Sequence, residues 1–417
     1  MLFKNGIDIF QTTINTNKEV FVKYLFTVLL VFTVSTAMLA GGFQLNEHGA
    51  RAMAQGGAWA ARAYDGSAIY FNPAGLGFQT KGSVYLGTTL IMPSSTFYGP
   101  TNQGQSTKNE MVSQTFTPIN VYASYPVMEN LVVGVGVNNP YGLGTEWPAN
   151  WSGKYITQKI DLTSFYFTPT VAYKFSDKLS VGVGMNYVTG DVSLSRIVSP
   201  GDAQVSLDLS GTGTGFNAGA LYKATDELSI GVSYRTSVKI DAEGTAKFKP
   251  TSALFPEGDA SASLELPSTA FFGLAYKVMP NLELEADYQM VGWSSYNELK
   301  IDFKKNNSSS VSPKNYEDTY ILRIGGEYTM DALQIRFGYL FDNNPVTDRY
   351  TEPLLPDADR NGFNIGAGYK INENLSVDVS YLFLKFAERK VVNTEIQFDG
   401  VYQSSANLIG FNIGYSF

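Results

Sequence analysis

The chain has 417 residues, a net charge of −8 and no cysteine. The missing thiols exclude a disulfide framework and cysteine-based metal sites or nucleophiles, and the acidic balance argues against a nucleic-acid partner, which needs a basic face. Charged residues make up 16% of the sequence and aromatic residues 14%, with 40 glycines. Soluble globular proteins carry about 25% charged residues, so this composition favours an all-β membrane protein.

The N-terminal residues 1–40 have the layout of a secretory signal peptide. Lys18 and Lys23 precede an uncharged apolar stretch, residues 24–39, which ends in small residues. A basic region, an apolar region and a small-residue cleavage zone are the parts of such a peptide. The apolar stretch is short for a spanning helix, which needs about 20 residues. We therefore predict cleavage between Ala37 and Gly42, with a retained membrane anchor as the alternative.

Residues 41–79 show no periodic apolar pattern and are rich in alanine and glycine. Proline fixes φ, asparagine hydrogen-bonds to its own backbone and glycine permits positive φ, so Asn72, Pro73, Ala74 and Gly75 predict a turn. The apolar run 69–71 leads directly into this turn, and what it packs against depends on the rest of the chain.

From residue 80 to residue 417 apolar residues recur with a period of two. Near the C-terminus, for example, Ile409, Phe411 and Ile413 are separated by Gly410 and Asn412. Such alternation predicts β-strands with one apolar face and one small or polar face.

The connections between these strands alternate in length. Short turns are predicted at 127–130, 176–178, 225–227, 279–281, 330–332 and 371–374, each shortly after a tyrosine, and long polar loops at 93–114, 141–158, 197–203, 244–258, 304–315, 343–360 and 390–402. Short turns on one side, long loops on the other and an aromatic belt are typical of bacterial outer-membrane barrels. We predict a transmembrane antiparallel β-barrel of about 14 strands over residues 80–417. A soluble sandwich or propeller would explain the alternation but not the two-sided loop lengths.

A barrel of this size encloses a lumen that its wall side chains do not fill. We therefore predict that residues 41–79 form an N-terminal hatch, or plug, inside it. Residues 69–71 would pack in the lumen, and residues 72–75 would turn the chain toward the first strand. Glycines on the inward face, among them Gly134 and Gly182, would let the hatch approach the wall.

Three motifs resemble the FadL family of outer-membrane transporters of long-chain fatty acids, and the resemblance covers essentially the whole mature chain. They are Gly42-Phe43-Gln44-Leu45-Asn46-Glu47, Asn72-Pro73-Ala74, and Asn139-Pro140-Tyr141-Gly142-Leu143-Gly144-Thr145-Glu146, in which Pro140 replaces the usual residue. The resemblance implies a barrel closed by a hatch, capture of ligand among extracellular loops, passage to a deeper pocket and lateral exit at a kink in the third strand. It also implies that rearrangement of the hatch opens the path, with Asn72, Pro73, Ala74 and Gly75 as the gating residues. Relatives carry aromatic hydrocarbons, so an aromatic-hydrocarbon channel is the alternative.

The kink is predicted at Asn138, Asn139, Pro140, Tyr141 and Gly142. Proline cannot donate to the strand ladder, and a strand that stops pairing inside the wall would leave a local opening. The plainer interpretation is that Pro140 only ends the strand and begins the loop.

Four residues are predicted to bind ligand: Arg196, Leu143, Trp147 and Trp151. Unbroken alternation places Arg196 on the lumen side, and its guanidinium can hold a carboxylate with two hydrogen bonds. A bulge near Gly190 would reverse its direction. The tryptophans form an apolar patch with Leu143 where solvated loop residues are expected, which usually marks a contact site. Packing against a neighbouring loop, or a place at the lipid interface, is the alternative.

Charged residues are also predicted to face the lumen. Three arginines, Arg235, Arg323 and Arg336, are expected to pair with wall or hatch carboxylates. For Arg323 and Arg336 the expected partners are Glu283, Glu285 and Asp287.

No catalytic or cofactor motif survives inspection. The glycine pairs do not open helices, so phosphate binding is improbable. His48 is the only histidine, which disfavours a zinc site, and no GxSxG motif accompanies it. We therefore predict a passive transporter without cofactor or metal, monomeric and bound only to outer-membrane lipid and to a hydrophobic small molecule, with long-chain fatty acid as the leading ligand. A structural or receptor protein of the outer membrane is a further alternative.

Overall fold

The computed structural model describes residues 41–199, 201–251, 255–392 and 395–417. The predicted signal peptide, residues 1–40, lies outside the described residues. Within the described part of the chain, no helix has both the length and the apolar character needed to cross a bilayer.

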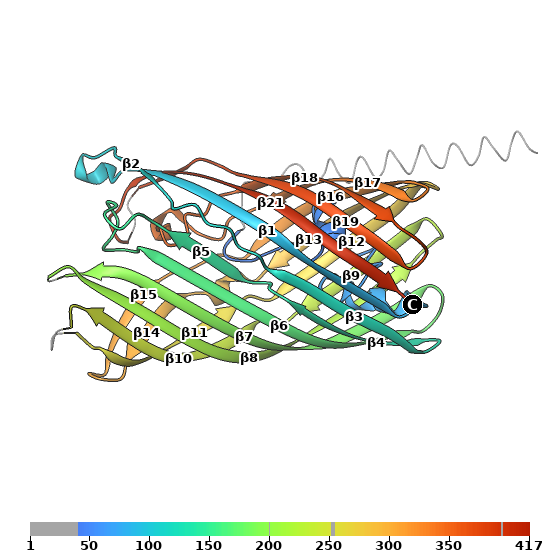
Figure 1. Ribbon diagram of the computed structural model, residues 1–417, viewed down its shortest axis with the longest axis horizontal. Coiled ribbons are helices and arrows are strands. Elements are labelled where there is room, and N and C mark those ends of the chain that lie inside the picture. The colour runs from blue at the N-terminus through green and yellow to red at the C-terminus, as the bar shows by residue number, and fades with distance from the viewer. Residues whose placement is uncertain (1–40, 200, 252–254, 393–394) are drawn as a thin grey trace, which may run out of the picture. The chain divides into compact units, whose positions relative to one another are not determined.

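Fourteen antiparallel strands close into a barrel, because the first strand pairs with the last as well as with its sequence neighbour. The strands run obliquely along the long axis (Figure 1). In chain order they are β1 (Ser83–Tyr98), β3 (Ile119–Met128), β4 (Leu131–Asn138), β6 (Lys159–Lys174), β7 (Leu179–Val198), β8 (Ala203–Lys223), β9 (Leu228–Arg235), β12 (Thr269–Met279), β13 (Leu282–Val291), β16 (Thr319–Met330), β17 (Leu333–Asp342), β18 (Arg360–Lys370), β19 (Leu375–Phe386) and β21 (Gly400–Ser416).

Seven further strands extend this wall at the end of the barrel that carries the long loops. They are β2 (Lys108–Glu110), β5 (Gly142–Glu146), β10 (Val238–Lys249), β11 (Gly258–Leu266), β14 (Glu298–Phe303), β15 (Ser308–Pro313) and β20 (Arg389–Val391). Three short 3-10 helices of the described chain lie at the same end: η2 (Thr101–Gln103), η3 (Trp293–Ser295) and η4 (Asp348–Tyr350). The predicted all-β transmembrane barrel is therefore confirmed.

All six short turns lie where the sequence predicts them; β12, for example, ends at Met279 and β13 begins at Leu282. The predicted loop bounds are partly wrong. Residues 93–98 belong to β1, and β10 continues through Lys249 while pairing with β8. Polar residues dominate these stretches because the strands continue beyond the apolar belt, where both faces can meet water, so polarity did not mark their ends.

The two faces of the wall follow the predicted alternation. On β6, Phe167, Val171 and Tyr173 are exposed on the outside, while Ala172 and Tyr166 are buried inside. Apolar outward faces are stable in lipid because the closed ladder satisfies the backbone hydrogen bonds.

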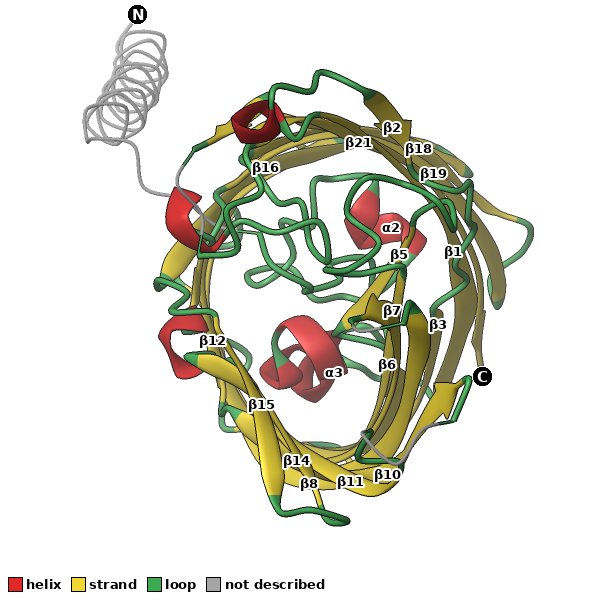
Figure 2. Cartoon of the chain, turned by 90° about the vertical axis from the view of Figure 1, so that its left-hand side faces the viewer, coloured by secondary structure: helices red, strands yellow, loops and turns green. Residues whose placement is uncertain are grey.

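The N-terminal segment Gly41–Gln79 lies inside the ring of strands, where its short helices α2 (Ala50–Met53) and α3 (Ala68–Phe71) are visible in Figure 2. A 3-10 helix, η1 (Pro73–Phe78), completes it before β1 begins. Residues 69–71 are buried in one cluster with wall residues such as Tyr122 and Phe271. Wall glycines permit this approach, since a Cβ at Gly182 would lie 2.4 Å from the backbone of Pro73.

Candidate functional site

Two neighbouring cavities lie between the N-terminal segment and the wall. The first, which we call the loop-end groove, has a volume of about 60 Å³ and lies among the strand extensions. Nearly all of its lining is apolar, and the lining residues are Phe43, Leu143, Ile160, Leu162, Val192, Leu194, Leu207, Leu209, Ala242, Ala262, Leu264, Tyr296, Leu299, Ile301, Tyr316, Leu354 and Leu355. Its apolar lining suits a short apolar segment of a ligand, because its volume is below the roughly 300–1,000 Å³ of pockets that hold whole ligands.

The second, which we call the wall cavity, has a volume of about 370 Å³. Its lining includes segment residues 42–47, inward residues of β17, β19 and β21 such as Leu340 and Leu408, and residues 142–145 of β5. It shares Phe43, Leu143, Leu162 and Leu355 with the loop-end groove, so the two spaces adjoin.

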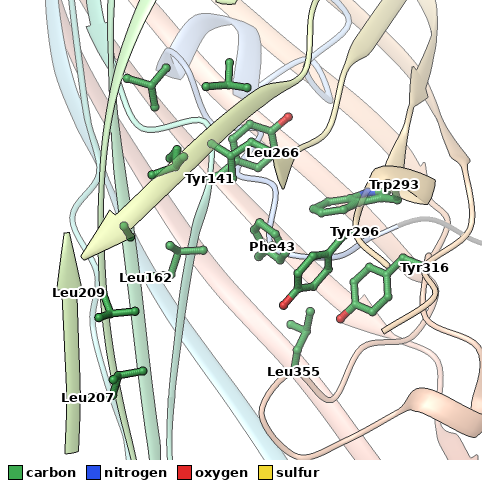
Figure 3. Packing of buried hydrophobic residues seen from close by; sticks show 14 of the residues in the cluster. Phe43, Tyr141, Leu162, Leu207, Leu209, Leu266, Trp293, Tyr296, Tyr316 and Leu355 are labelled. Atoms are coloured by element: carbon green, nitrogen blue, oxygen red, sulfur yellow. The ribbon is translucent and has the colours of Figure 1, made fainter. Parts of the chain in front are cut away.

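Phe43 stands at the junction of the two cavities. Its ring makes edge contacts with Trp293, Tyr296 and Tyr141, at centroid distances of 4.7, 5.6 and 6.1 Å. Figure 3 shows the ring at the centre of this aromatic cluster, with Leu355 beyond Tyr296. Phe43 therefore contributes to the lining of both spaces.

The predicted kink residues lie at a break in the wall. The pairing of β4 with β6 stops at Asn138, opposite Tyr166, and the pairing of β5 with β6 resumes at Gly142, opposite Thr163. Between these two pairs, the chain from β4 to β5 has three residues and β6 has two. One extra residue on one side is the arrangement of a β-bulge. The chain resumes pairing after Pro140, so this proline does more than end a strand.

Asn139 bridges the two sides of the break. Its Nδ2 donates to the carbonyl oxygen of Ser164 at 2.7 Å, and its Oδ1 accepts from the backbone N–H of Ile119 at 2.9 Å. Beyond Ile119 the ladder between β3 and this strand does not continue, and residues 116–119 line the wall cavity instead.

The wall cavity reaches both faces of β6. Leu162 lies on the buried, inward side of this strand, whereas Asp161, Thr163 and Phe165 lie on the opposite side, and all four line the cavity. Side chains from both faces of β6 thus contribute to the lining of this cavity, next to the break between β4 and β5.

The N-terminal segment pairs with the break itself. The backbone N–H of Leu45 donates to the carbonyl oxygen of Pro140 at 2.8 Å, and the N–H of Gly142 donates to that of Phe43 at 3.0 Å. These bonds form an antiparallel bridge between Gln44 and Tyr141. The segment therefore covers backbone groups that the kink removes from the ladder.

Asn72 holds the predicted turn against the opposite wall. Its side chain accepts from Ala74 N at 3.2 Å, which caps η1, and donates to the carbonyl oxygens of Ala60 and Ala220, at 2.8 and 3.1 Å. Pro73 and Ala74 press on Gly182, and Gly75 packs against Ala63. The predicted turn is thus the N-cap and the first turn of η1, a buried anchor that lies just before β1.

Arg196 lies on β7, half-buried, on the same face as Val192 and Leu194 of the loop-end groove. The pairing register of β7 with β8 is unbroken around Gly190, so no bulge reverses its direction. Arg196 itself is not among the groove's lining residues, and the charge that acts on it is that of Glu352.

The sequence prediction missed a second cation in this region. Lys314 is buried and pairs with Glu352, next to groove residues Leu354 and Tyr316. Nothing in the sequence distinguishes Lys314 from other loop lysines, because its burial depends on loops far apart in the chain.

The tryptophan pair lies elsewhere than predicted. Trp147 and Trp151 stack on each other, with ring centroids 4.5 Å apart, in a buried cluster with Phe97 and Tyr402. Neither lines the loop-end groove or the wall cavity. For the two tryptophans, the structure therefore supports the alternative, packing between loops, and not the expected place in a capture groove. Leu143, in contrast, lines both cavities.

One carboxylate ties the N-terminal segment to the opposite wall. Glu327 accepts from Arg51 and Arg62 of the segment, at 2.7 and 3.2 Å, and from Arg336 of β17 at 2.6 Å. Arg336 also contacts Asp378, so the predicted pairing of Arg336 with wall carboxylates is confirmed.

The other predicted pairings are wrong. Arg323 donates to the uncharged oxygens of Gly56, Asn46 and Gln289, and Arg235 donates to those of Asn186 and Tyr70.

The carboxylates expected to meet those arginines have other partners. Asp287 accepts the backbone N–H groups of Trp59 and Ala60, Glu285 accepts that of Ala61, and Glu283 pairs with Arg62. The segment has few backbone partners of its own here, so wall side chains satisfy its amides. Among the described residues, no group of three or more His, Cys, Asp or Glu side chains could hold a metal ion.

Comparisons with known proteins agree with this geometry. The sequence model of the family described as "Outer membrane protein transport protein (OMPP1/FadL/TodX)" matches residues 31–417. The long-chain fatty acid transport protein of Escherichia coli K12 is 24% identical, over 95% of this chain and 99% of its own.

Two solved structures share the fold. A Pseudomonas aeruginosa FadL homologue superposes with a TM-score of 0.81 at 21% identity, covering 90% of this chain and 100% of its own. The Ralstonia pickettii toluene transporter TbuX gives 0.69 at 19% identity, covering 88% and 98%. The chain belongs to the OMPP1/FadL/TodX family of outer-membrane β-barrel proteins, which transport hydrophobic compounds and are not enzymes.

Proposed function

We propose that this protein takes up long-chain fatty acids, or similar hydrophobic molecules, passively through the outer membrane. The observation that carries the proposal is a pair of adjoining cavities, an apolar groove and a larger cavity that is lined mostly by apolar residues but also holds charged ones. The loop-end groove adjoins the wall cavity at Phe43, and the wall cavity would open to the outer face of the barrel beside the break between β4 and β5, because side chains from both faces of β6 line it. A ligand can follow this route without crossing an aqueous pore.

The N-terminal segment is the proposed gate. It supplies Phe43 at the junction, and its bridge to Pro140 and Gly142 closes the inner side of the break. The Asn72 turn and the Glu327 ion pairs fix the rest of the segment to the wall. Movement of residues 42–47 alone would therefore open the route while the anchors hold.

The charges beside the groove favour a fatty acid at the entrance. Arg196 and Lys314 outnumber Glu352 there, and an arginine fork can hold a carboxylate with two hydrogen bonds. The alkyl chain would lie along the apolar groove and continue into the larger wall cavity. Because the whole route lies within one barrel, we propose that the monomer is the working unit.

An aromatic-hydrocarbon channel is the second candidate. The four rings of Phe43, Tyr141, Trp293 and Tyr296 lie together at the junction of the route. Offset and edge contacts with such rings suit an aromatic ligand. The relative TbuX is named as a toluene transporter.

Uptake of radiolabelled oleate and toluene by cells that lack their own transporter tests these functions. The chains to compare are the intact protein and Asn72→Ala, each first shown to reach the outer membrane. Oleate uptake by the intact chain, reduced in Asn72→Ala, would support fatty-acid transport with a segment-dependent gate. Uptake of toluene alone would favour the second candidate. Uptake of neither would count against transport of both classes and favour a structural or receptor role.

A further inference from the structure

The loop-end groove and the wall cavity differ in the sign of their charge. Arg196 and Lys314 lie beside the groove, whereas three carboxylates and one guanidinium line the wall cavity. The carboxylates are those of Glu47, Asp161 and Asp342, and the guanidinium is that of Arg360. A ligand that moves from one cavity to the other therefore meets opposite charge.

The guanidinium in the wall cavity is already engaged. Arg360 Nη2 donates to Asp357 and to the carbonyl oxygen of Gly42, both at 2.7 Å, and Nε donates to Asp357 at 3.2 Å. Asp357 is fully buried and neutralises this cation. Arg360 is also in ion-pair contact with Asp342, so two carboxylates share this one cation.

Asp342 is an acceptor without a matching donor. The residue is 2% exposed and lines the cavity, and its Oδ1 has no hydrogen-bond partner. Its Oδ2 lies 3.7 Å from Arg360 Nη1, which is ion-pair distance but too long for a hydrogen bond. A buried acceptor left unpaired is destabilising, so a donor from a ligand would be favoured here.

Glu47 repeats this arrangement on the N-terminal segment. The residue is 7% exposed, and the hydrogen bond its carboxylate accepts comes from the backbone N–H of Asn46, at 2.9 Å. Within the described part of the chain no lysine or arginine lies within 4.0 Å of it; Arg323 and Arg360 act on it only from farther away.

We propose that the wall cavity selects an apolar chain that ends in a hydrogen-bond donor, a hydroxyl or an ammonium group, and rejects an ionised carboxylate. The proposal rests on the proposed function, because it describes the second half of the same route. Glu47 and Asp342 are the specificity-determining residues: each offers a buried carboxylate oxygen to a donor and repels an anion. A fatty acid would leave its ionised head at Arg196 and Lys314, or pass onward as the neutral acid, whose O–H is itself a donor.

Three ligands with one chain length separate the head groups: dodecylamine, dodecan-1-ol and dodecanoate. Their binding would be measured by calorimetry on the full barrel in lipid nanodiscs, with empty nanodiscs subtracted. Leu408→Trp fills only the wall cavity and Leu264→Trp only the groove, because each leucine lines one space. We expect Leu408→Trp to abolish amine and alcohol binding, and Leu264→Trp to weaken dodecanoate binding most.

The double variant Glu47→Gln, Asp342→Asn removes the two charges while keeping the side-chain shapes. It should weaken dodecylamine about tenfold or more, strengthen dodecanoate comparably and make dodecanoate sensitive to Leu408→Trp. The control Glu243→Gln, Asp302→Asn removes two exposed carboxylates, 75% and 45% accessible. It should leave the affinities for dodecylamine and dodecanoate unchanged. Glu47→Gln alone, which leaves the wall unaltered, should shift both ligands in the same directions.

Two results would overturn the inference. In the first, dodecanoate binds in the wall cavity of the unaltered protein as tightly as dodecylamine, and neutralising Glu47 and Asp342 changes the affinity for neither ligand. The selectivity would then be absent, whereas hydrophobic transport would stand. If none of the three ligands binds, the inference and the proposed transport function both fail.

Discussion

The carbonyl oxygen of Phe43 accepts a hydrogen bond of 3.0 Å from the backbone N–H of Gly142. The residue that separates the two cavities is thereby joined, through its main chain, to the residue at which the interrupted wall resumes its pairing. Displacing the segment at this point would move Phe43 and uncover the break in one step.

Leu45→Pro should loosen this bridge. Proline has no N–H, so the 2.8 Å bond from Leu45 to Pro140 would be lost, at a net cost of about 1 kcal/mol. We expect faster hydrogen exchange at the neighbouring amide of Gly142 and faster entry of a fluorescent fatty acid into cells. Leu45→Ala removes the side chain but keeps the N–H, and should leave the exchange of Gly142 unchanged. Equal exchange in both variants would show that the bridge does not hold the segment.

Gly144→Val should close the outer part of the wall cavity. A Cβ at Gly144 would lie 1.9 Å from the ring of Phe116, and both residues line the cavity beside the break. We expect fatty-acid uptake to fall about tenfold or more while binding at the loop-end groove persists, because the exit is blocked and the entrance is not. Uptake assays in cells and calorimetry on the purified barrel measure the two quantities separately.

The matched control for Gly144→Val is Gly326→Val on β16. There a Cβ would meet the side-chain ends of Phe337 and Leu284, at 2.6 and 2.8 Å, and none of these three residues lines either cavity. Uptake should survive this change. Normal uptake by Gly144→Val would exclude lateral exit at this site.

The sequence predicts the barrel well because its signals are local and repeated. Period-two alternation and the tyrosines before short turns recur in strand after strand, so single exceptions do not hide the pattern. The strand ends near 93–98 and 244–249 were misplaced because polar composition marks exposure to water and not the end of hydrogen bonding.

The site is harder to predict because it is assembled from distant residues. Phe43 contacts Trp293, and Lys314 pairs with Glu352, only because closure of the barrel brings these segments together. Trp147 and Trp151 misled for the same reason. An aromatic pair in a loop predicts burial, but not whether a ligand or another loop buries it.

Arg196→Ala should weaken binding of long-chain fatty acid by about tenfold or more, since a charge-assisted contact contributes about 1.5–3 kcal/mol. Binding of toluene should not change, because toluene offers no carboxylate. Arg196→Lys keeps the charge and should restore only part of the affinity, because the planar fork is lost. Calorimetry measures all three, with Lys300→Ala, 48% exposed, as a neutral comparison. Unchanged fatty-acid affinity in Arg196→Ala would remove this residue from the site.

Glu327→Gln should free the N-terminal segment from the far wall. Glu327 is buried and holds Arg51, Arg62 and Arg336 together, and removing one member of a buried ion-pair network costs about 3–5 kcal/mol because the remaining charges lose their partner. We expect faster hydrogen exchange over residues 50–64 and a lower unfolding temperature. The strands that pair through backbone bonds should keep their protection.

Glu395→Gln is the comparison for that change. Glu395 pairs with Arg349 at the surface, where their side chains are 36% and 66% exposed. An exposed pair contributes about 0–1 kcal/mol, so this variant should match the unaltered protein. Equal protection of residues 50–64 in both variants would mean that the segment is held by its apolar contacts and by the Asn72 turn, and that the arginines only neutralise the lumen.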